Sequence, residues 1–202
     1  MIYKAASLAK DFDVSFLSME NDKEAMVKKL FVESKPYSDY LKRLMIVNQS
    51  DCLDPSKHQY QTIIDGYSVA DLKNKGYIKF TPTFPFEEFE ESKSYLLISF
   101  RDVAPSVNPE FMNTSIDILC ITNFKSWELD NYAVRPWKMA GYVNGILNKS
   151  RLSGIGVLNL MGASEFTWNE DIGGVLLTYV ATHSTDDKAK ISEESGIVDD
   201  DL

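Results

Sequence analysis

The segment 113–184 constrains the fold more strongly than any other part of this 202-residue chain. Its apolar patterns and its start and stop signals predict a strand, a helix and two further strands, over residues 114–123, 136–149, 155–168 and 173–183. Proline is favoured at the first helical position, which places the start of the helix at Pro136. The polar turn between the last two strands is typical of a β-hairpin. The segment therefore predicts an α+β fold, a mainly antiparallel sheet with a packed helix.

A further strand precedes this segment. Residues 94–100, SYLLISF, are typical of a fully buried strand, and we expect them to form an antiparallel hairpin with 114–123 whose tip is a long loop over 101–113. One face of 114–123 should hold Ile116, Ile118 and Cys120, and the other Asp117, Leu119 and Ile121. No second titratable group is paired with Asp117, so we expect a structural acid satisfied by a partner and not a catalytic one.

The helix 136–149 should pack against strand 173–183, which is apolar on both faces and predicts a central strand covered on both sides. Its buried face is expected to hold apolar residues at spacings of three and four: Trp137, Ala140, Val143 or Asn144, and Leu147. Gly141 and Gly145 each weaken the helix by roughly 1 kcal/mol relative to alanine. Close packing of these glycines against the sheet or against a neighbouring subunit would offset that cost.

The first half of the chain predicts a helical region in front of the sheet. An apolar stripe predicts one helix that stops at Pro36 and a second short helix through about Val47. The simpler interpretation of the stripe is core, and a partner-binding helical hairpin stays open as the alternative. Beyond it we expect a short strand, one helical turn, a half-buried strand and an exposed loop rich in Phe, Pro and acids, over residues 59–65, 69–75, 77–83 and 83–93.

Charge divides the chain into a near-neutral body and an acidic tail. The net charge is -9, and residues 186–202 carry -5 of it through seven acids and two lysines. We therefore expect a single α+β domain over 1–185, with a helical arm over about 18–47, followed by an acidic tail over 186–202. Such a balance argues against a surface that grips nucleic acid through lysine and arginine. Cys52 and Cys120 favour reduced thiols in a cytoplasm, and no apolar run predicts a signal peptide or a membrane span.

Motifs for catalysis or metal binding are not found in the sequence. His58 and His183 lack the spacing of metal ligands, and the chain has no nucleophile elbow, zinc-protease motif or dinucleotide fingerprint. A nucleophilic pair of Cys120 and His183 is conceivable, but a buried small residue and a strand-end histidine are the simpler interpretation. We therefore expect a protein that is not an enzyme and that binds no cofactor and no metal.

The order of elements in the last ninety residues resembles a known family. A strand SIDILCITN, a loop FKSWELDNYA, a helix RPWKMAGYVNGILN and the strands GIGVLNLMGASEF and DIGGVLLTYVATH follow one another. This order, with Asp117 and Cys120 on the strand and Arg135 before the helix, is similar to the tail terminator (tail-completion, head–tail joining) proteins of long-tailed bacteriophages. The N-terminal region and the acidic tail depart from the compact members of that family.

The resemblance implies a structural virion protein, assembled in the host cytoplasm, that forms a hexameric ring at the head-proximal end of the tail tube. Such a ring terminates tail assembly and joins the tail to the neck. Its partners would be copies of itself, the tail tube protein and the neck or connector proteins, with DNA passing through the lumen without specific binding. The open alternatives are another neck or tail structural protein, such as a connector, stopper or collar, and a soluble α+β binding module.

Subunit contacts of such a ring are expected in the 101–113 loop, the 124–134 loop and the tail. These regions hold tryptophan, tyrosine and arginine, the residue types most often found as interface anchors, together with apolar and acidic residues. The candidate interface residues are Val107, Phe111, Trp127, Glu128, Tyr132, Arg135, Glu193 and Glu194.

Overall fold

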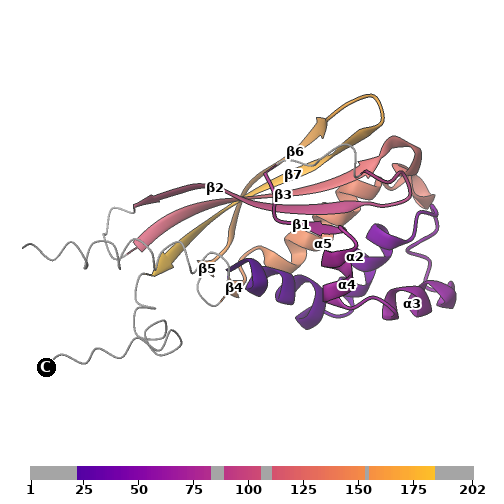
Figure 1. Cartoon of the computed structure of the whole chain (residues 1–202), viewed down its shortest axis with the longest axis horizontal. Helices are drawn as coiled ribbons and strands as arrows, with labels where there is room; N and C mark the ends of the chain where they lie inside the picture. Colours follow the sequence, from indigo (N-terminus) through magenta and orange to yellow (C-terminus); the bar gives the residue numbers. More distant parts are fainter. Residues whose placement is uncertain (1–21, 83–88, 106–110, 153–154, 185–202) are drawn as a thin grey trace, which may run out of the picture.

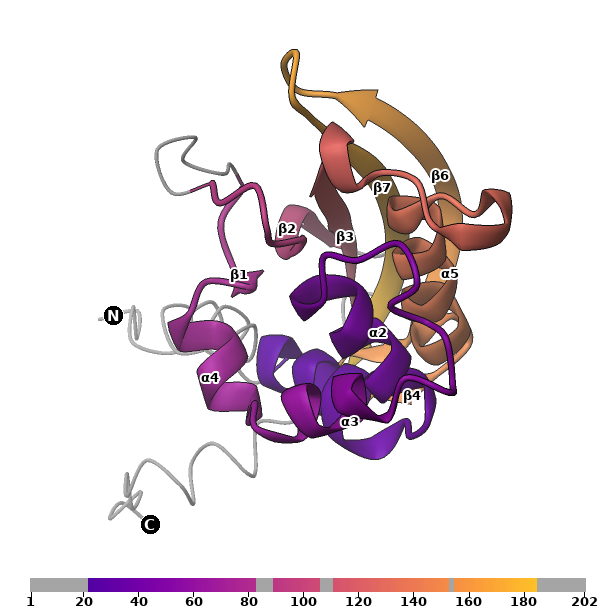
Figure 2. The ribbon, with the colours of Figure 1, turned by 90° about the vertical axis from the view of Figure 1, so that its right-hand side faces the viewer.

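The computed structural model describes residues 22–82, 89–105, 111–152 and 155–184. They form a layer of helices packed on one face of a sheet (Figures 1 and 2). The fold is α+β with a mainly antiparallel sheet, as the sequence predicts. The sheet has five strands in the order β1-β2-β3-β7-β6. Their bounds are β1 Ile78–Lys79, β2 Tyr95–Pro105, β3 Phe111–Asn123, β6 Asn159–Thr167 and β7 Ile172–Ser184.

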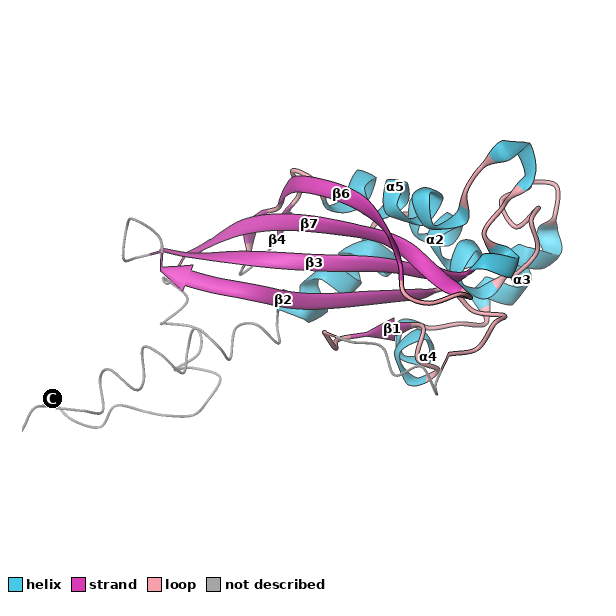
Figure 3. Cartoon of the chain, turned by 90° about the horizontal axis from the view of Figure 1, so that it is seen from above, coloured by secondary structure: helices cyan, strands magenta, loops and turns pink. Residues whose placement is uncertain are grey.

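The strands alternate in direction across most of the sheet. β1 is parallel to β2, whereas β2–β3, β3–β7 and β7–β6 are antiparallel pairs. Figure 3 shows β2, β3, β7 and β6 side by side in this order, with the helices behind them. A separate two-stranded ribbon joins α5 to β6 and consists of β4 Arg151–Leu152 and β5 Gly156–Val157. The predicted hairpin of the last two strands is confirmed as β6 and β7.

The helical layer comes from two distant parts of the chain. Residues 22–28 are helical and continue into a π-helical turn at Lys29–Glu33. They are followed by α2 Tyr37–Ile46, α3 His58–Asp65 and α4 Val69–Asn74, and α5 Arg135–Leu147 joins them from the C-terminal half. The two predicted N-terminal helices and the helix that starts beside Pro136 are confirmed.

The core lies between the helices and the inner face of the sheet. Ile116, Ile118 and Cys120 of β3 lie there together, as their alternation predicts, and are inaccessible to solvent. They pack in one cluster with the inner residues of β2 and β7 and with the buried faces of α2 and α5. This cluster holds most of the buried apolar surface, the main favourable contribution to folding.

The outer face of the sheet is covered at one end. Tyr95, Leu97, Ile121 and Ile172 form a second, smaller buried cluster there, with Phe89, Leu119, Phe166 and Trp168 packed against it. Beyond that cluster the face becomes polar. Asp117 accepts hydrogen bonds from Arg101 at 3.0 Å and from Thr178 at 2.9 Å. Asp117 is thus the satisfied structural acid that the sequence predicts.

Four expectations about the elements are wrong. Residues 59–65 form a helix instead of a strand. The predicted loop over 101–113 is largely strand, because β2 continues to Pro105 and β3 already begins at Phe111. The region 155–168 is broken into β5 and β6. The strand over 173–183 is covered on its outer face only at its start, since Leu176, Thr178 and Val180 on that face are partly exposed.

Arg135 fastens the two parts of the helical layer to each other. Its side chain is 1% exposed, and its guanidinium donates to the carbonyl oxygens of Leu44, Val47, Asn48 and Gln49 at 2.8–3.1 Å. The Nε–H donates to the carbonyl oxygen of Ser126 at 2.7 Å. Since a guanidinium has five N–H donors, this arrangement uses its full capacity.

The charge of Arg135 is balanced by backbone dipoles. Within the described ranges, no carboxylate forms an ion pair with it. Four of the five carbonyls that it binds belong to the C-terminal end of α2 and the residues after it, where the helix dipole is negative. Burial lowers the pKa of the Arg135 guanidinium, but arginine remains protonated in proteins.

We expect Arg135→Met to lower the free energy of unfolding by about 3–5 kcal/mol, because each buried acceptor that loses its donor costs about 1–3 kcal/mol. Methionine fills similar space, but the buried carbonyl oxygens of Leu44, Val47 and Ser126 lose this donor. Urea unfolding followed by circular dichroism measures the change. The matched control is Arg151→Met at an exposed position, with an expected change within about 0.5 kcal/mol. A loss below about 1 kcal/mol in Arg135→Met would show that the carbonyls find other donors.

Candidate subunit interface

A shallow groove runs along the solvent side of α5 where α2 lies beside it. It encloses about 610 Å³ and is lined by Tyr37, Val134, Trp137, Lys138, Gly141, Tyr142 and Gly145. Its wall is aromatic. The ring of Tyr142 stacks on Tyr40 with centroids 5.6 Å apart and meets Tyr37 at 6.2 Å. Burial raises the pKa of the Tyr142 hydroxyl, so Tyr142 is uncharged at neutral pH.

The rotation of α5 about its own axis determines which of its side chains reach the groove. The helix buries Met139, Val143 and Leu147 against the sheet. The opposite side of the helix therefore carries Trp137 and Lys138, which are exposed. Trp137 was expected in the core, and this prediction is wrong, since its side chain is 43% exposed.

Gly141 and Gly145 form the floor of the groove. A Cβ built on either glycine meets nothing within 4 Å. Neither glycine is therefore needed for packing against the described part of the subunit. The expectation of close packing against the sheet is wrong, and packing against a neighbouring subunit remains a prediction.

The loop between β3 and α5 presents Tyr132 to solvent. Asn131 and Tyr132 have φ values of 62° and 60°, in the left-handed region that non-glycine residues rarely adopt. The side chain of Tyr132 is fully exposed, at 104% of its reference area. The base of the loop is closed by a bridge between Glu128 and Val134. A strained backbone that holds an aromatic ring in water is typical of binding sites, and not of loops that only connect.

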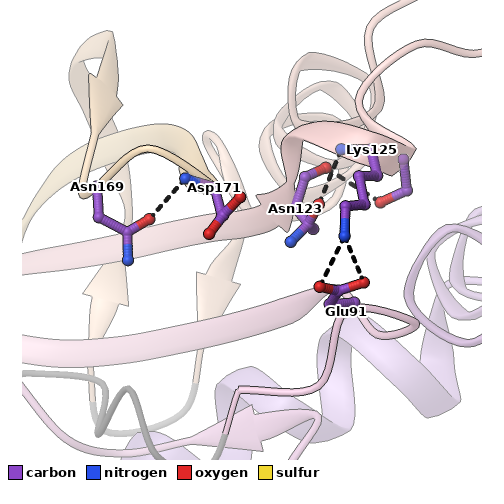
Figure 4. Close-up of polar contacts among 6 residues, drawn as sticks. Glu91, Asn123, Lys125, Asn169 and Asp171 are labelled. Carbon is purple, nitrogen blue, oxygen red and sulfur yellow. Dashed lines mark hydrogen bonds and ion pairs between the residues drawn. The ribbon is translucent and has the colours of Figure 1, made fainter.

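The start of this loop is held by polar contacts at one end of the sheet (Figure 4). The Asn123 side chain accepts from the backbone N–H of Lys125 at 2.8 Å. The Lys125 ammonium donates to both carboxylate oxygens of Glu91 at 2.8 Å, and these bonds raise the pKa of Lys125. Asn169 fixes the β6–β7 turn in the same way by accepting from the N–H groups of Asp171 and Ile172.

Strand β6 continues the exposed surface beyond the groove. The indole N–H of Trp137 donates to Glu165 of β6 at 3.1 Å, which connects α5 to this strand. Met161 on β6 is 67% exposed. Tyr37, Tyr132, Trp137 and Met161 are thus large apolar side chains that the described subunit leaves exposed.

The structure places the predicted interface residues in three groups. Tyr132 and Glu128 are exposed on the loop, and Trp127 is half-buried with its ring 4.9 Å from that of Phe124. The prediction that Arg135 is an interface anchor is wrong. Its side chain is buried, and its N–H groups donate hydrogen bonds within the subunit. The remaining candidates cannot be placed: Val107, Glu193, Glu194 and the acidic tail over 186–202 lie outside the described residues, as does the side chain of Phe111. Sequence reasoning did not identify Tyr37, Met161 and the exposure of Trp137.

The strand register separates the one Cys–His pair that the sequence suggested. Cys120 and His183 are not opposed, since Cys120 pairs with Val175 and His183 with Met112. No cluster of three metal-ligating side chains occurs within the described ranges. Asp51 lines a smaller hollow beside the loop, and the hydrogen bond from Tyr60 lowers its pKa. The Asp51 side chain is therefore an ionised carboxylate at neutral pH, fixed by this hydrogen bond, and not a proton donor.

The comparisons with known proteins give a family. A family model described as YomW matches residues 38–181, more than two thirds of the chain. None of the curated proteins matches the sequence. Among solved structures, a chain from the virion of a native gene transfer agent (GTA) particle is similar, with 17% identity and a TM-score of 0.40 over 62% of this chain and 90% of that chain. A likeness at this level carries no argument about function. In the described part of the chain, no helix has the length and apolarity needed to span a bilayer.

We expect Gly141→Ala and Gly145→Ala each to raise the free energy of unfolding of the isolated subunit by up to about 1 kcal/mol. Alanine is a better helix former by this amount, and open space surrounds both positions. Thermal unfolding measures the gain. The control is Gly156→Ala, where φ is +80° and a Cβ would meet the Thr182 carbonyl oxygen at 2.5 Å, so stability should fall. Destabilisation by Gly141→Ala would show that the floor of the groove is occupied within the subunit.

We expect Tyr132→Gly to stabilise the isolated subunit by about 0.5–1 kcal/mol, because glycine adopts the left-handed region without the steric cost that tyrosine bears. The exposed ring gives up no burial that would offset this gain. Asn131→Gly at the neighbouring left-handed position is the control and should gain less, since asparagine tolerates that region. Equilibrium unfolding in urea distinguishes the two. Equal gains would contradict the strain assigned to Tyr132.

Proposed function

The chain belongs to the YomW family, and from this premise we propose that it is a structural protein of a phage or phage-like virion. In this proposal it forms a hexameric ring at the head-proximal end of the tail tube, terminates tail assembly and joins the tail to the neck. Its partners are copies of itself, the tail tube protein and the neck proteins. The resemblance of 113–184 to tail terminators supports this role, because the elements on which it rests form β3, α5, β6 and β7.

The observation that carries the proposal is the exposed aromatic groove beside α5, together with the exposed Tyr132 of the neighbouring loop. Tyr132 is fully exposed on a left-handed backbone. Gly141 and Gly145, four residues apart on α5, have no packing reason within the described subunit. Each feature costs the isolated subunit stability. A neighbour that covers the surface would offset these costs by burying the aromatic rings.

The chemistry of the described residues supports a structural role and not a catalytic one. The groove has one charged group at its edge, Lys138, and is otherwise aromatic and glycine-lined. A small-molecule site would need several convergent polar groups in a concave pocket. This composition favours a protein partner over the alternative of a stand-alone binding module.

The charge of the chain suits a ring that DNA traverses. The net charge of -9 gives a field that repels phosphates. A lumen lined by such subunits would let DNA pass without gripping it, whereas lysine and arginine would release counterions and hold the strand. Specific DNA binding is therefore not part of the proposed role.

We expect purified protein to assemble into a species near six times the 22.9 kDa subunit mass. Trp137→Ala and Tyr132→Gly should shift this species toward monomer while the subunit stays folded, because both remove aromatic area from the proposed contact. Light scattering across a concentration series measures the shift. Ile63→Ala on α3 is the control, since Ile63 is also exposed but lies outside the groove.

Quantitative mass spectrometry of purified virions tests the role independently of assembly in solution. The proposal expects the protein at a few copies per particle, in the tail or neck fraction. A protein that is absent from the particles contradicts the structural role. A particle-borne protein in the head fraction contradicts the tail-end position.

A further inference from the structure

The sheet has two open edges. β6 forms one of them, and in the described part of the chain its only strand partner is β7. The other is β2, which β1 covers only at Leu96 and Leu97. From Ser99 to Pro105, no strand within the described ranges pairs with the outer side of β2. Open edges carry unpaired N–H and C=O groups and are templates for pairing with another chain.

The directions of these two edge strands are complementary. β2, β3, β7 and β6 alternate in direction, so β2 and β6 run antiparallel to each other at opposite edges (Figure 3). A rotation about an axis along the strands leaves these directions unchanged. It therefore places β6 of one copy antiparallel to β2 of the next and continues the alternation. Within the described residues an isolated copy leaves both edges open, and a closed ring would leave neither.

The two edges also bend at the same height. β2 has an irregularity between Phe100 and Asp102, and β6 has one between Leu160 and Gly162. Phe100 pairs with Ile116, Ile116 with Tyr179, and Tyr179 with Leu160. Both bulges thus flank Tyr179, at the same level of the sheet. Since a bulge bends and twists its strand, the two edges curve together where copies at equal height would meet.

The side chains of β6 leave its edge accessible. Residues 161–165 are all exposed, and three of them are the small residues Gly162, Ala163 and Ser164. Natural proteins protect edge strands with lysine, with proline or with a β-bulge. β6 contains neither lysine nor proline, and its bulge lies at the level of the bulge in β2. Its one charged residue, Glu165, is turned to the helix side, where it binds Trp137.

We propose that β6 of one copy adds to the exposed half of β2 in the next copy, so that the sheets of successive copies join into one continuous antiparallel sheet. The pairing is heterologous, because one edge meets the other and not itself. This inference rests on the proposed ring, and it assigns the ring contact to backbone hydrogen bonds between these strands. The aromatic groove then lies beside this contact, on the helix side of β6.

Cross-linking of single-cysteine variants tests the pairing. One protein carries Met161→Cys on β6 and the other Asp102→Cys on β2; both positions are exposed and lie at the two bulges. The native thiols of Cys52 and Cys120 are buried and should not react. A short bis-maleimide tolerates a shift of one residue in register. Gly162→Cys serves as a second β6 position, because a Cβ there meets nothing within 4 Å.

We expect cross-linked dimers when the two proteins are mixed and none from either alone, and a ladder that stops at the ring size from a chain with both cysteines. Met161→Cys mixed with Ile63→Cys is the negative control. Efficient cross-linking of Met161→Cys to itself would overturn the inference, because it would show that β6 pairs with β6. A ring in light scattering without the mixed dimer would also overturn it but leave the proposed function standing. Absence of the protein from virions would instead overturn the proposed function.

Discussion

The helical layer of this subunit depends on one buried cation. The sheet is built largely from hairpins between strands close in sequence, but its cover comes from residues 22–74 and from α5, which are far apart in the chain. Arg135 joins them by donating to four carbonyls around the end of α2 and to the carbonyl of Ser126. Arg135 is also the first residue of α5, so the helix begins at the residue that connects it to the end of α2. The loop that ends there, with Tyr132 at its tip, is therefore held from both sides.

Much of the fold could be predicted because its signals are local. The alternation of Ile116, Ile118 and Cys120 identified the inner face of β3, and Pro136 located the start of α5. The failures arose where one signal was read too strongly or a short run was ambiguous. Pro105 suggested a loop, yet it stands at the end of a strand whose outer side is unpaired, where proline is tolerated. Residues 59–65 are too few for their periodicity to distinguish a helix from a strand.

The candidate interface was less predictable than the fold. Arginine is typical of both interface anchors and buried clamps, and only the backbone carbonyls that converge on Arg135 distinguish them. Trp137 was assigned to the core because its spacing from Ala140 fits one helix face. Ala140, Val143 and Leu147 of that face are buried, but Trp137 lies at its edge and reaches solvent. The exposure of Met161 depends on β6 being an edge strand, a property of strand order that a local pattern does not contain.

The hydrogen bonds that Arg135 donates to backbone carbonyls also affect how the subunit responds to acid. Most ion pairs that hold distant segments together use a carboxylate, and they weaken when that carboxylate takes up a proton. The partners of Arg135 are backbone carbonyl oxygens, which do not titrate, and the guanidinium keeps its charge. The junction between the two halves of the helical layer is therefore independent of pH over the range in which surface acids lose their charge.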